Sequence, residues 1–136
     1  MHTPERIAEL ATEAFNGRDA HALLALWSEH LRYEGPDGVC EGRAAMLERE
    51  HNLWRAFPDV KVAIRCFCSG PDKVVFETTF EGSHSGPLVL GDRQVPPTGR
   101  PLKLTISAHA TLENGLIRHE RVYFDRLSLL DQLGLV

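Results

Sequence analysis

The sequence has few cysteines and no long apolar run. Its 136 residues include Cys40, Cys66 and Cys68, an odd number that contains no CxxC pair. This spacing argues against a zinc ribbon or a thioredoxin-type redox site and favours reduced, buried thiols. No stretch approaches 18 consecutive apolar residues, and the first residues form no apolar signal segment. We therefore expect a cytoplasmic protein with no membrane partner.

An excess of positive charge is also missing. Fifteen Lys and Arg residues stand against nineteen Asp and Glu residues, a net charge of −4 without a basic stripe, which argues against nucleic acid as a partner. The contents of 43% hydrophobic and 25% charged residues are ordinary for a globular chain. A chain of this length predicts one domain over residues 1–136.

The motifs of nucleotide and metal binding are absent from the sequence. There is no GxGxxG, no P-loop and no GxSxG elbow. The seven histidines are dispersed and form no HxH, HxxxH or HExxH pair. We expect neither a cofactor nor a metal ion.

The N-terminal part of the chain predicts three helices. Thr3 and Pro4 supply a cap and a first helical residue, and apolar residues at helical spacing follow as far as Asn16. Asp19 can cap a second, apolar helix over 20–28, and an extended piece at 30–34 precedes a third helix over 43–56.

The hydrophobic period changes to two after residue 60. Runs at 60–69 and 73–81 predict one hairpin, and runs at 102–112 and 116–125 predict another around Asn114-Gly115. The intervening segment 82–101 is rich in Gly and Pro and long enough to be a pocket rim or lid. A last helix is expected at 127–134. The order predicts an α+β fold with helices on one face of an antiparallel sheet.

Alternation along the last strand separates a polar from an apolar face. His119, Arg121, Tyr123 and Asp125 share one face, and Glu120, Val122 and Phe124 share the other. His109 on the preceding strand is expected opposite the polar set. The pattern leaves open which face lines a pocket, and the face without helices predicts a homodimer.

Five short segments stand out as possible family motifs: Ala-Phe-Pro-Asp-Val at 56–60, Phe-Glu-Gly-Ser-His-Ser-Gly at 80–86, Pro-Pro-Thr-Gly-Arg at 96–100, Tyr-Phe-Asp at 123–125 and Leu-Leu-Asp-Gln-Leu-Gly at 129–134. Together they resemble the SnoaL-like polyketide cyclase family of the nuclear-transport-factor-2-like superfamily. The resemblance implies a cone-shaped, curved antiparallel sheet, an α+β barrel, whose pocket is enclosed by the three N-terminal helices. It also implies a frequent homodimer through the outer face of the sheet.

The resemblance makes Asp125 the candidate acid/base group, because related cyclases use an aspartate near the pocket. A carboxylate needs an apolar environment to act as a base at neutral pH. The position before a final helix also suits an N-cap, the commoner role of a carboxylate at the end of an element, which would lower its pKa. Both interpretations stay open.

Other side chains are candidates for contact with a ligand. His109 and His84 are expected to donate hydrogen bonds to a developing oxyanion, with His84 at the rim in the 82–101 segment. The predicted ligand-binding residues are Tyr33, His51, Trp54, Arg121 and Tyr123.

The sequence thus predicts a cofactor-independent acid/base enzyme, of cyclase, isomerase or lyase type, for a small hydrophobic carbonyl or polyketide-like compound. The alternatives are a non-catalytic small-ligand-binding or dimerisation domain of the same fold, and an epoxide hydrolase.

Overall fold

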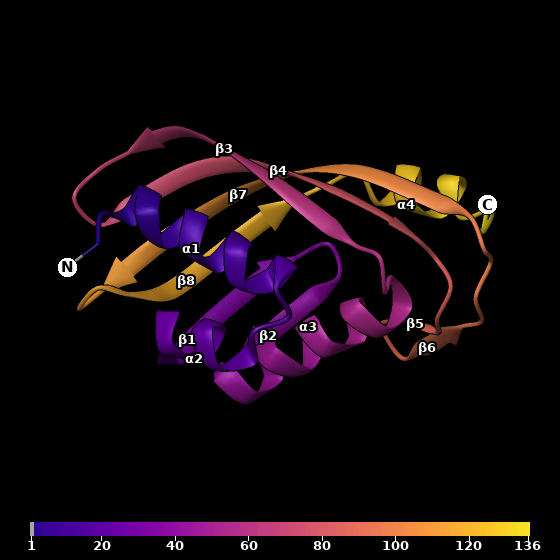
Figure 1. The fold of residues 1–136 in the computed structure, drawn as a ribbon, viewed down its shortest axis with the longest axis horizontal. Helices are drawn as coiled ribbons and strands as arrows, with labels where there is room; N and C mark the ends of the chain where they lie inside the picture. The colour runs from indigo at the N-terminus through magenta and orange to yellow at the C-terminus, as the bar shows by residue number, and fades with distance from the viewer. Residues whose placement is uncertain (1) are drawn as a thin grey trace.

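The computed structural model describes residues 2–136 and has mixed α and β architecture (Figure 1). Its elements follow in the order α1 (Pro4–Asn16), α2 (Ala20–Leu26), β1 (Trp27–Gly35), β2 (Gly38–Glu41), α3 (Arg43–Ala56), β3 (Lys61–Ser69), β4 (Lys73–Ser83), β5 (Leu88–Leu90), β6 (Arg93–Val95), β7 (Pro101–Glu113), β8 (Leu116–Tyr123) and α4 (Arg126–Gln132). No helix within residues 2–136 has the length and apolar character needed to cross a bilayer.

The first helices begin where their caps predict. The Thr3 hydroxyl accepts a hydrogen bond from the Arg6 amide at 3.1 Å, and Asp19 accepts one from the Ala22 amide at 3.0 Å. The second helix ends at Leu26, two residues earlier than expected, because Trp27 is already extended and pairs with Ile117 of β8. The expected extended piece at 30–34 is therefore part of a longer strand.

Six strands form one curved sheet in the order β2-β1-β8-β7-β4-β3. Both predicted hairpins, β3–β4 and β7–β8, are confirmed, and Asn114 and Gly115 take the positive φ values, 54° and 77°, that the second turn requires. The predicted antiparallel sheet is confirmed for the other strand pairs, whereas β1 pairs with β8 in parallel. This pairing needs no tight turn, since the two strands lie far apart in the chain.

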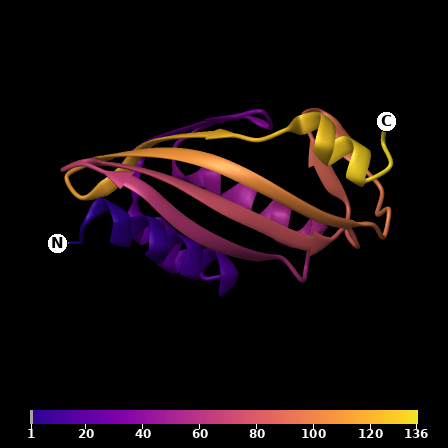
Figure 2. The same cartoon turned by 90° about the horizontal axis from the view of Figure 1, so that it is seen from above.

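The sheet is an open cone and not a closed barrel. Its edge strands in the described chain, β2 and β3, do not pair with each other. Helices α1, α2 and α3 gather on one side of the sheet, while α4 and the β5–β6 hairpin lie at the end away from the N-terminus (Figures 1 and 2). The open side of the cone is thus covered by helices, which places a cavity between the two layers.

The Gly- and Pro-rich segment 82–101 is anchored to the end of α3. The amides of Ser85 and Gly86 both donate to the Ala56 carbonyl at 3.1 Å. A Cβ at Gly86 would lie 1.9 Å from the Arg55 carbonyl oxygen, so only glycine permits this approach. The segment also contains the β5–β6 hairpin, whose Leu88 and Val95 are buried. Its course closes one end of the cone.

Candidate functional site

Two adjoining chambers lie between the concave face of the sheet and the helices. The inner chamber has a volume of about 130 Å³ and is lined by α1, α3 and the inner faces of β4, β7 and β8. The outer chamber, of about 350 Å³, is lined by the β1–β2 turn, α3, the 88–91 segment and Leu129 of α4. The side chains that line both chambers are Tyr33, Arg49, Leu53, Phe80 and Ile106. These five residues form a waist between the chambers.

The inner chamber is mainly apolar. Its walls include Ile7, Phe15, Trp27, Met46, Phe76, Ala108, Ala110 and Val122. The charged side chains among the described residues that line it are Arg49, Glu50 and Glu120. Because water and protein dipoles are scarce between such walls, charges here interact strongly and each charged group needs a partner.

Arg49 organises the polar side of the waist. Its Nε donates to Asp37 Oδ2 at 2.7 Å and its Nη1 donates to Glu50 Oε1 at 3.1 Å. Its guanidinium lies 4.2 Å from the centre of the Tyr33 ring, and the Tyr33 hydroxyl donates to Asp37 Oδ1 at 2.7 Å. Tyr33, Asp37, Arg49 and Glu50, hereafter the Arg49 cluster, therefore hold one another in place.

Burial changes the acidity of the Arg49 cluster. It raises the pKa of Tyr33, which keeps the phenol protonated and able to donate to Asp37. It also raises the pKa of the Glu50 carboxyl, although the positive charge of Arg49 opposes this effect. The guanidinium thus donates to two carboxylates through Nε and Nη1.

Glu120 is the carboxyl group that this cluster does not satisfy. It lies on β8 between Tyr33 of β1 and Ala110 of β7, and its side chain lines the inner chamber. It accepts no hydrogen bond from any residue in the range 2–136. Burial raises its pKa to about 7, Arg49 opposes the rise, and Glu50 and Asp37 add to it. A carboxyl in this state exchanges a proton readily at neutral pH.

Arg49, Glu50, Asp37 and Glu120 were not among the residues predicted from the sequence, yet a signal existed for two of them. Glu50 stands at an apolar position of the third helix, one turn after Met46, and Glu120 alternates with Val122 and Phe124 on the apolar face of the last strand. Burial of a carboxylate is costly, so a carboxylate on an apolar face is a candidate functional group.

Asp125 lies outside both chambers. It is exposed, and its Oδ1 accepts a hydrogen bond from the Ser128 amide at 3.0 Å, so it is the N-cap of α4. The strand that was expected to reach residue 125 ends at Tyr123 because the chain turns into this helix. The interpretation of Asp125 as an N-cap is therefore confirmed. Its role as the base stays a prediction.

His109, Arg121 and Tyr123 come together, but on the face of the sheet away from the helices. His109 pairs with Arg121 across β7 and β8, and its ring centre lies 5.9 Å from that of Tyr123. Tyr123 is 54% exposed. The structure thereby decides the open question of the two faces: the face with Glu120 and Val122 lines the cavity.

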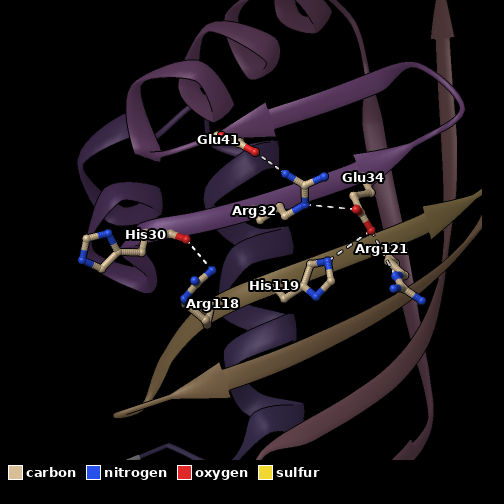
Figure 3. A network of polar contacts seen from close by, with 7 residues as sticks. All are labelled: His30, Arg32, Glu34, Glu41, Arg118, His119 and Arg121. Atoms are coloured by element: carbon tan, nitrogen blue, oxygen red, sulfur yellow. Dashed lines mark hydrogen bonds and ion pairs between the residues drawn. The ribbon is translucent and has the colours of Figure 1, made fainter.

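A network of charges covers this outer face (Figure 3). The Glu34 carboxylate accepts from Arg32 Nε at 3.0 Å and from Arg121 Nε at 3.1 Å, and it lies 3.2 Å from His119 Nε2. Arg32 also pairs with Glu41, while Arg118 donates to the His30 carbonyl at 2.5 Å. These contacts lower the pKa of Glu34, with Arg32 first among the causes.

His84 is fully buried and supports the 82–101 segment. Its Nδ1 accepts from the Thr98 amide at 3.2 Å and lies 2.9 Å from the Thr98 hydroxyl. Its ring packs on Phe57, and burial lowers the pKa of the imidazole. The residue lines neither chamber, and its predicted contact with an oxyanion stays a prediction.

The remaining predicted ligand-binding residues separate into two groups. Tyr33 lines both chambers. Trp54 is buried beside them, where its Nε1 donates to the Phe15 carbonyl at 3.1 Å, and exposed His51 stacks edgewise on it at 5.2 Å.

Within residues 2–136 no three His, Cys, Asp or Glu side chains converge on a point that suits a metal ion.

Comparison with solved structures shows the same fold over almost the whole chain. TsrD from Streptomyces laurentii is 26% identical, with a TM-score of 0.83 over 97% of this chain and 95% of that one. IdmH from Streptomyces antibioticus, a proposed polyketide cyclase, is 26% identical, with a TM-score of 0.80 over 98% and 99%. TerC, crystallised with polyporic acid, is 17% identical, with a TM-score of 0.76 over 96% and 98%.

The sequence comparison agrees with the fold. No curated protein matches the chain significantly. The model of the SnoaL-like polyketide cyclase family matches residues 5–133. The predicted resemblance is confirmed, and the chain belongs to the SnoaL-like polyketide cyclase family.

Proposed function

We propose that the protein is a cofactor-independent acid/base enzyme for a small hydrophobic carbonyl compound, with Glu120 as its general base. One observation carries the proposal: a carboxyl with no hydrogen-bond partner, and a pKa of about 7, faces an apolar chamber. Membership of a cyclase family and the small-molecule complex of TerC support a small-molecule substrate.

The reaction begins with proton transfer to Glu120. The carboxylate takes a proton from the carbon next to a substrate carbonyl, the C–H bond breaks, and its electron pair moves onto the carbonyl oxygen. The positive charge of Arg49 at the waist stabilises this enolate, since no residue within 2–136 accepts from its Nη2.

The enolate then has two fates. In an isomerisation, protonated Glu120 returns the proton to another carbon of the same molecule. In an aldol cyclisation, the enolate carbon forms a bond to a second carbonyl carbon, and Glu120 protonates the resulting alkoxide. Both reactions balance without an oxidant, a reductant or a cofactor.

Exchange of substrate protons with solvent tests the proposal. A panel of cyclic and linear β-diketones is incubated in D2O, and deuterium incorporation is followed by NMR. Glu120→Gln should slow enzyme-dependent exchange by about 10² to 10⁴-fold, the usual contribution of a general base. Glu77→Gln is the matched control, because Glu77 lies on β4 outside both chambers.

The same experiment separates the earlier candidates. Asp125→Asn, His109→Asn and His84→Asn are measured beside Glu120→Gln. Loss of exchange in Asp125→Asn with full activity in Glu120→Gln would return the role of base to Asp125. Binding of the diketones without any exchange would identify a ligand-binding domain instead.

We also propose a homodimer through the outer face of the sheet, in a protein of the cytoplasm. Tyr123 stands exposed among His109, Arg121 and Val75, and opposite charges on this face permit self-complementary pairing. The three free cysteines suit a reducing compartment. Sedimentation equilibrium should report a dimer that Tyr123→Glu converts to a folded monomer, and a monomeric parent protein would contradict the proposal.

A further inference from the structure

The charges that line the two chambers do not balance. Among the described residues the lining contains the carboxyl groups of Asp37, Glu48, Glu50 and Glu120 but only one basic side chain, Arg49. Glu48 is exposed and water can screen it. Asp37 is exposed as well, so Glu50 and Glu120 are the carboxyl groups that remain beside the single guanidinium.

The hydrogen bonds show where the excess of negative charge lies. Arg49 donates to Asp37 and to one oxygen of Glu50, whose side chain is only 7% exposed. No residue within 2–136 donates to the other oxygen of Glu50 or to either oxygen of Glu120. The acceptors without a donor therefore gather on the inner chamber, where both glutamates line the wall.

The ligand that complements such a wall brings a positive charge and N–H donors. An anion would be repelled by the carboxylates, and a neutral ligand without a donor would leave Glu120 unpaired in an apolar environment. We infer that the inner chamber binds the protonated nitrogen of an organic amine, with the carboxylates of Glu120 and Glu50 as its acceptors. The substrate class is then a carbonyl compound that carries a basic nitrogen.

The size and walls of the chamber agree with a small amine. A protein cavity of about 150 Å³ holds a benzene molecule, so the inner chamber, at about 130 Å³, suits a group of similar or smaller size. Trp27, Phe15 and Phe76 line it and can cover the hydrocarbon part of the ligand. The inference rests on the proposed function for the reaction, but the binding itself requires no turnover.

A bound cation would also activate the proposed base. Glu120 is about half protonated at pH 7 because its pKa is about 7. A positive nitrogen beside it favours the ionised form, so binding releases a proton and leaves a carboxylate ready to accept one from carbon. One carboxylate oxygen can face the nitrogen while the other faces the reacting carbon.

Three ligands with the same ring test the inference. Isothermal titration at pH 7 compares benzylammonium, benzyl alcohol and benzoate, which differ in charge. Benzylammonium should bind at least about tenfold more tightly than benzyl alcohol, the effect of one charge-assisted hydrogen bond, and benzoate should bind most weakly. Titrations in phosphate and in Tris, which differ in ionisation enthalpy, should show proton release with benzylammonium alone.

Variants assign the preference to the carboxylates. Glu120→Gln should reduce benzylammonium affinity to that of benzyl alcohol and abolish proton release, while the affinity for the alcohol stays the same. Glu77→Gln should change neither affinity. A smaller pair, trimethylammonium and tert-butanol, is measured alongside so that restricted entry of the ring is not mistaken for a missing charge preference.

The outcomes also separate the inference from the proposed function. The inference is overturned if neither cation binds more tightly than its neutral counterpart, or if the preference survives in Glu120→Gln. Diketone exchange that depends on Glu120 without a preference for amines would leave the proposed function standing and the inference wrong. An amine preference that depends on Glu120, without exchange, would support the inference and contradict the proposed function.

Discussion

Two glutamates lie one residue apart in the pairing of β1 with β8 and occupy opposite environments. On β1, Tyr33 pairs with Glu120 and the next residue, Glu34, pairs with Arg121. Because side chains alternate along a strand, Glu120 faces the chamber and Glu34 faces outward. Three basic groups surround Glu34 and lower its pKa. No basic side chain within residues 2–136 donates a hydrogen bond to Glu120, and burial raises its pKa to about 7.

The comparison shows that a carboxyl group gains its chemistry from what surrounds it. On the outer face water and cations satisfy Glu34, which gives it a structural part in a surface network. On the inner face Glu120 is half-buried between mainly apolar walls, and the nearby cation is engaged by two other carboxylates. The same side chain is then suited to accept a proton.

The largest expected effect is on the pH dependence of proton exchange. Only ionised Glu120 can act as a base, so the rate should fall below pH 7 and be about a hundredfold lower at pH 5 than on its plateau. Rates measured by NMR across this range should follow that profile in Glu34→Gln as well. An exchange rate that does not change near pH 7 would show that Glu120 is not the base.

The second effect concerns the stability of the Arg49 cluster. Arg49→Met leaves Asp37 and buried Glu50 without their cation, and the free energy of unfolding should fall by about 3 kcal/mol. Urea denaturation measures this loss. Arg32→Met, on the exposed outer face, is the control and should lose less than about 1 kcal/mol. Similar losses in both variants would contradict the contrast between the faces.

The third effect separates the two glutamates by the sign of their pH dependence. The pKa of Glu120 in the folded protein lies above its unfolded value, so folding becomes less favourable as the pH rises from about 4.5 to about 7. Glu120→Gln should therefore stabilise the protein at pH 8 by about 2 kcal/mol, allowing for solvent screening, and not at pH 4.

Glu34→Gln should show the reverse behaviour. The pKa of Glu34 is lowered on folding, so its contribution exists above the unfolded pKa and disappears as the pH falls through the folded value. The variant should be less stable than the parent at pH 7 and equal to it in strong acid. Thermal denaturation at several pH values measures both variants. A stability change with the same pH dependence in the two variants would contradict the opposite environments of Glu34 and Glu120.

The smallest effect is expected at Asp125. Asp125→Ala removes the cap of α4 and should lower the free energy of unfolding by about 1 kcal/mol, while Asp125→Asn, which can still cap, should lose less. Proton exchange should be unchanged in both. Lost exchange in a stable Asp125→Asn protein would show that the cap is also part of the catalytic machinery.

Local signals predicted most of the secondary structure. The caps at Thr3 and Asp19, the third helix over 43–56 and the Asn114-Gly115 turn depend on neighbouring residues, and all are found in the structure. The parallel pairing of β1 with β8 was missed because its partners, such as Tyr33 and Glu120, are remote in sequence. No short-range pattern encodes such a contact.

The site was harder to predict for the same reason. Motif resemblance directed attention to Asp125, although its position next to a helix start favoured a cap. Asp37, Arg49 and Glu120 belong to a turn, a helix and a strand that only the folded chain brings together. Of the predicted ligand-binding residues, Tyr33 alone lines the chambers among Tyr33, His51, Trp54, Arg121 and Tyr123.

Local patterns in the sequence predicted the α+β class and the two faces of the last strand, because periodicity and turn chemistry act over a few residues. The family was predicted from the resemblance of its motifs. The sequence did not determine which face would be enclosed. That choice depends on the side of the sheet where α1 and α3 pack, and it leaves Glu120 in an apolar chamber and Glu34 among cations at the surface. Burial and charge are set by distant neighbours, so the fold, and not the local sequence, gives the two carboxyl groups their different environments.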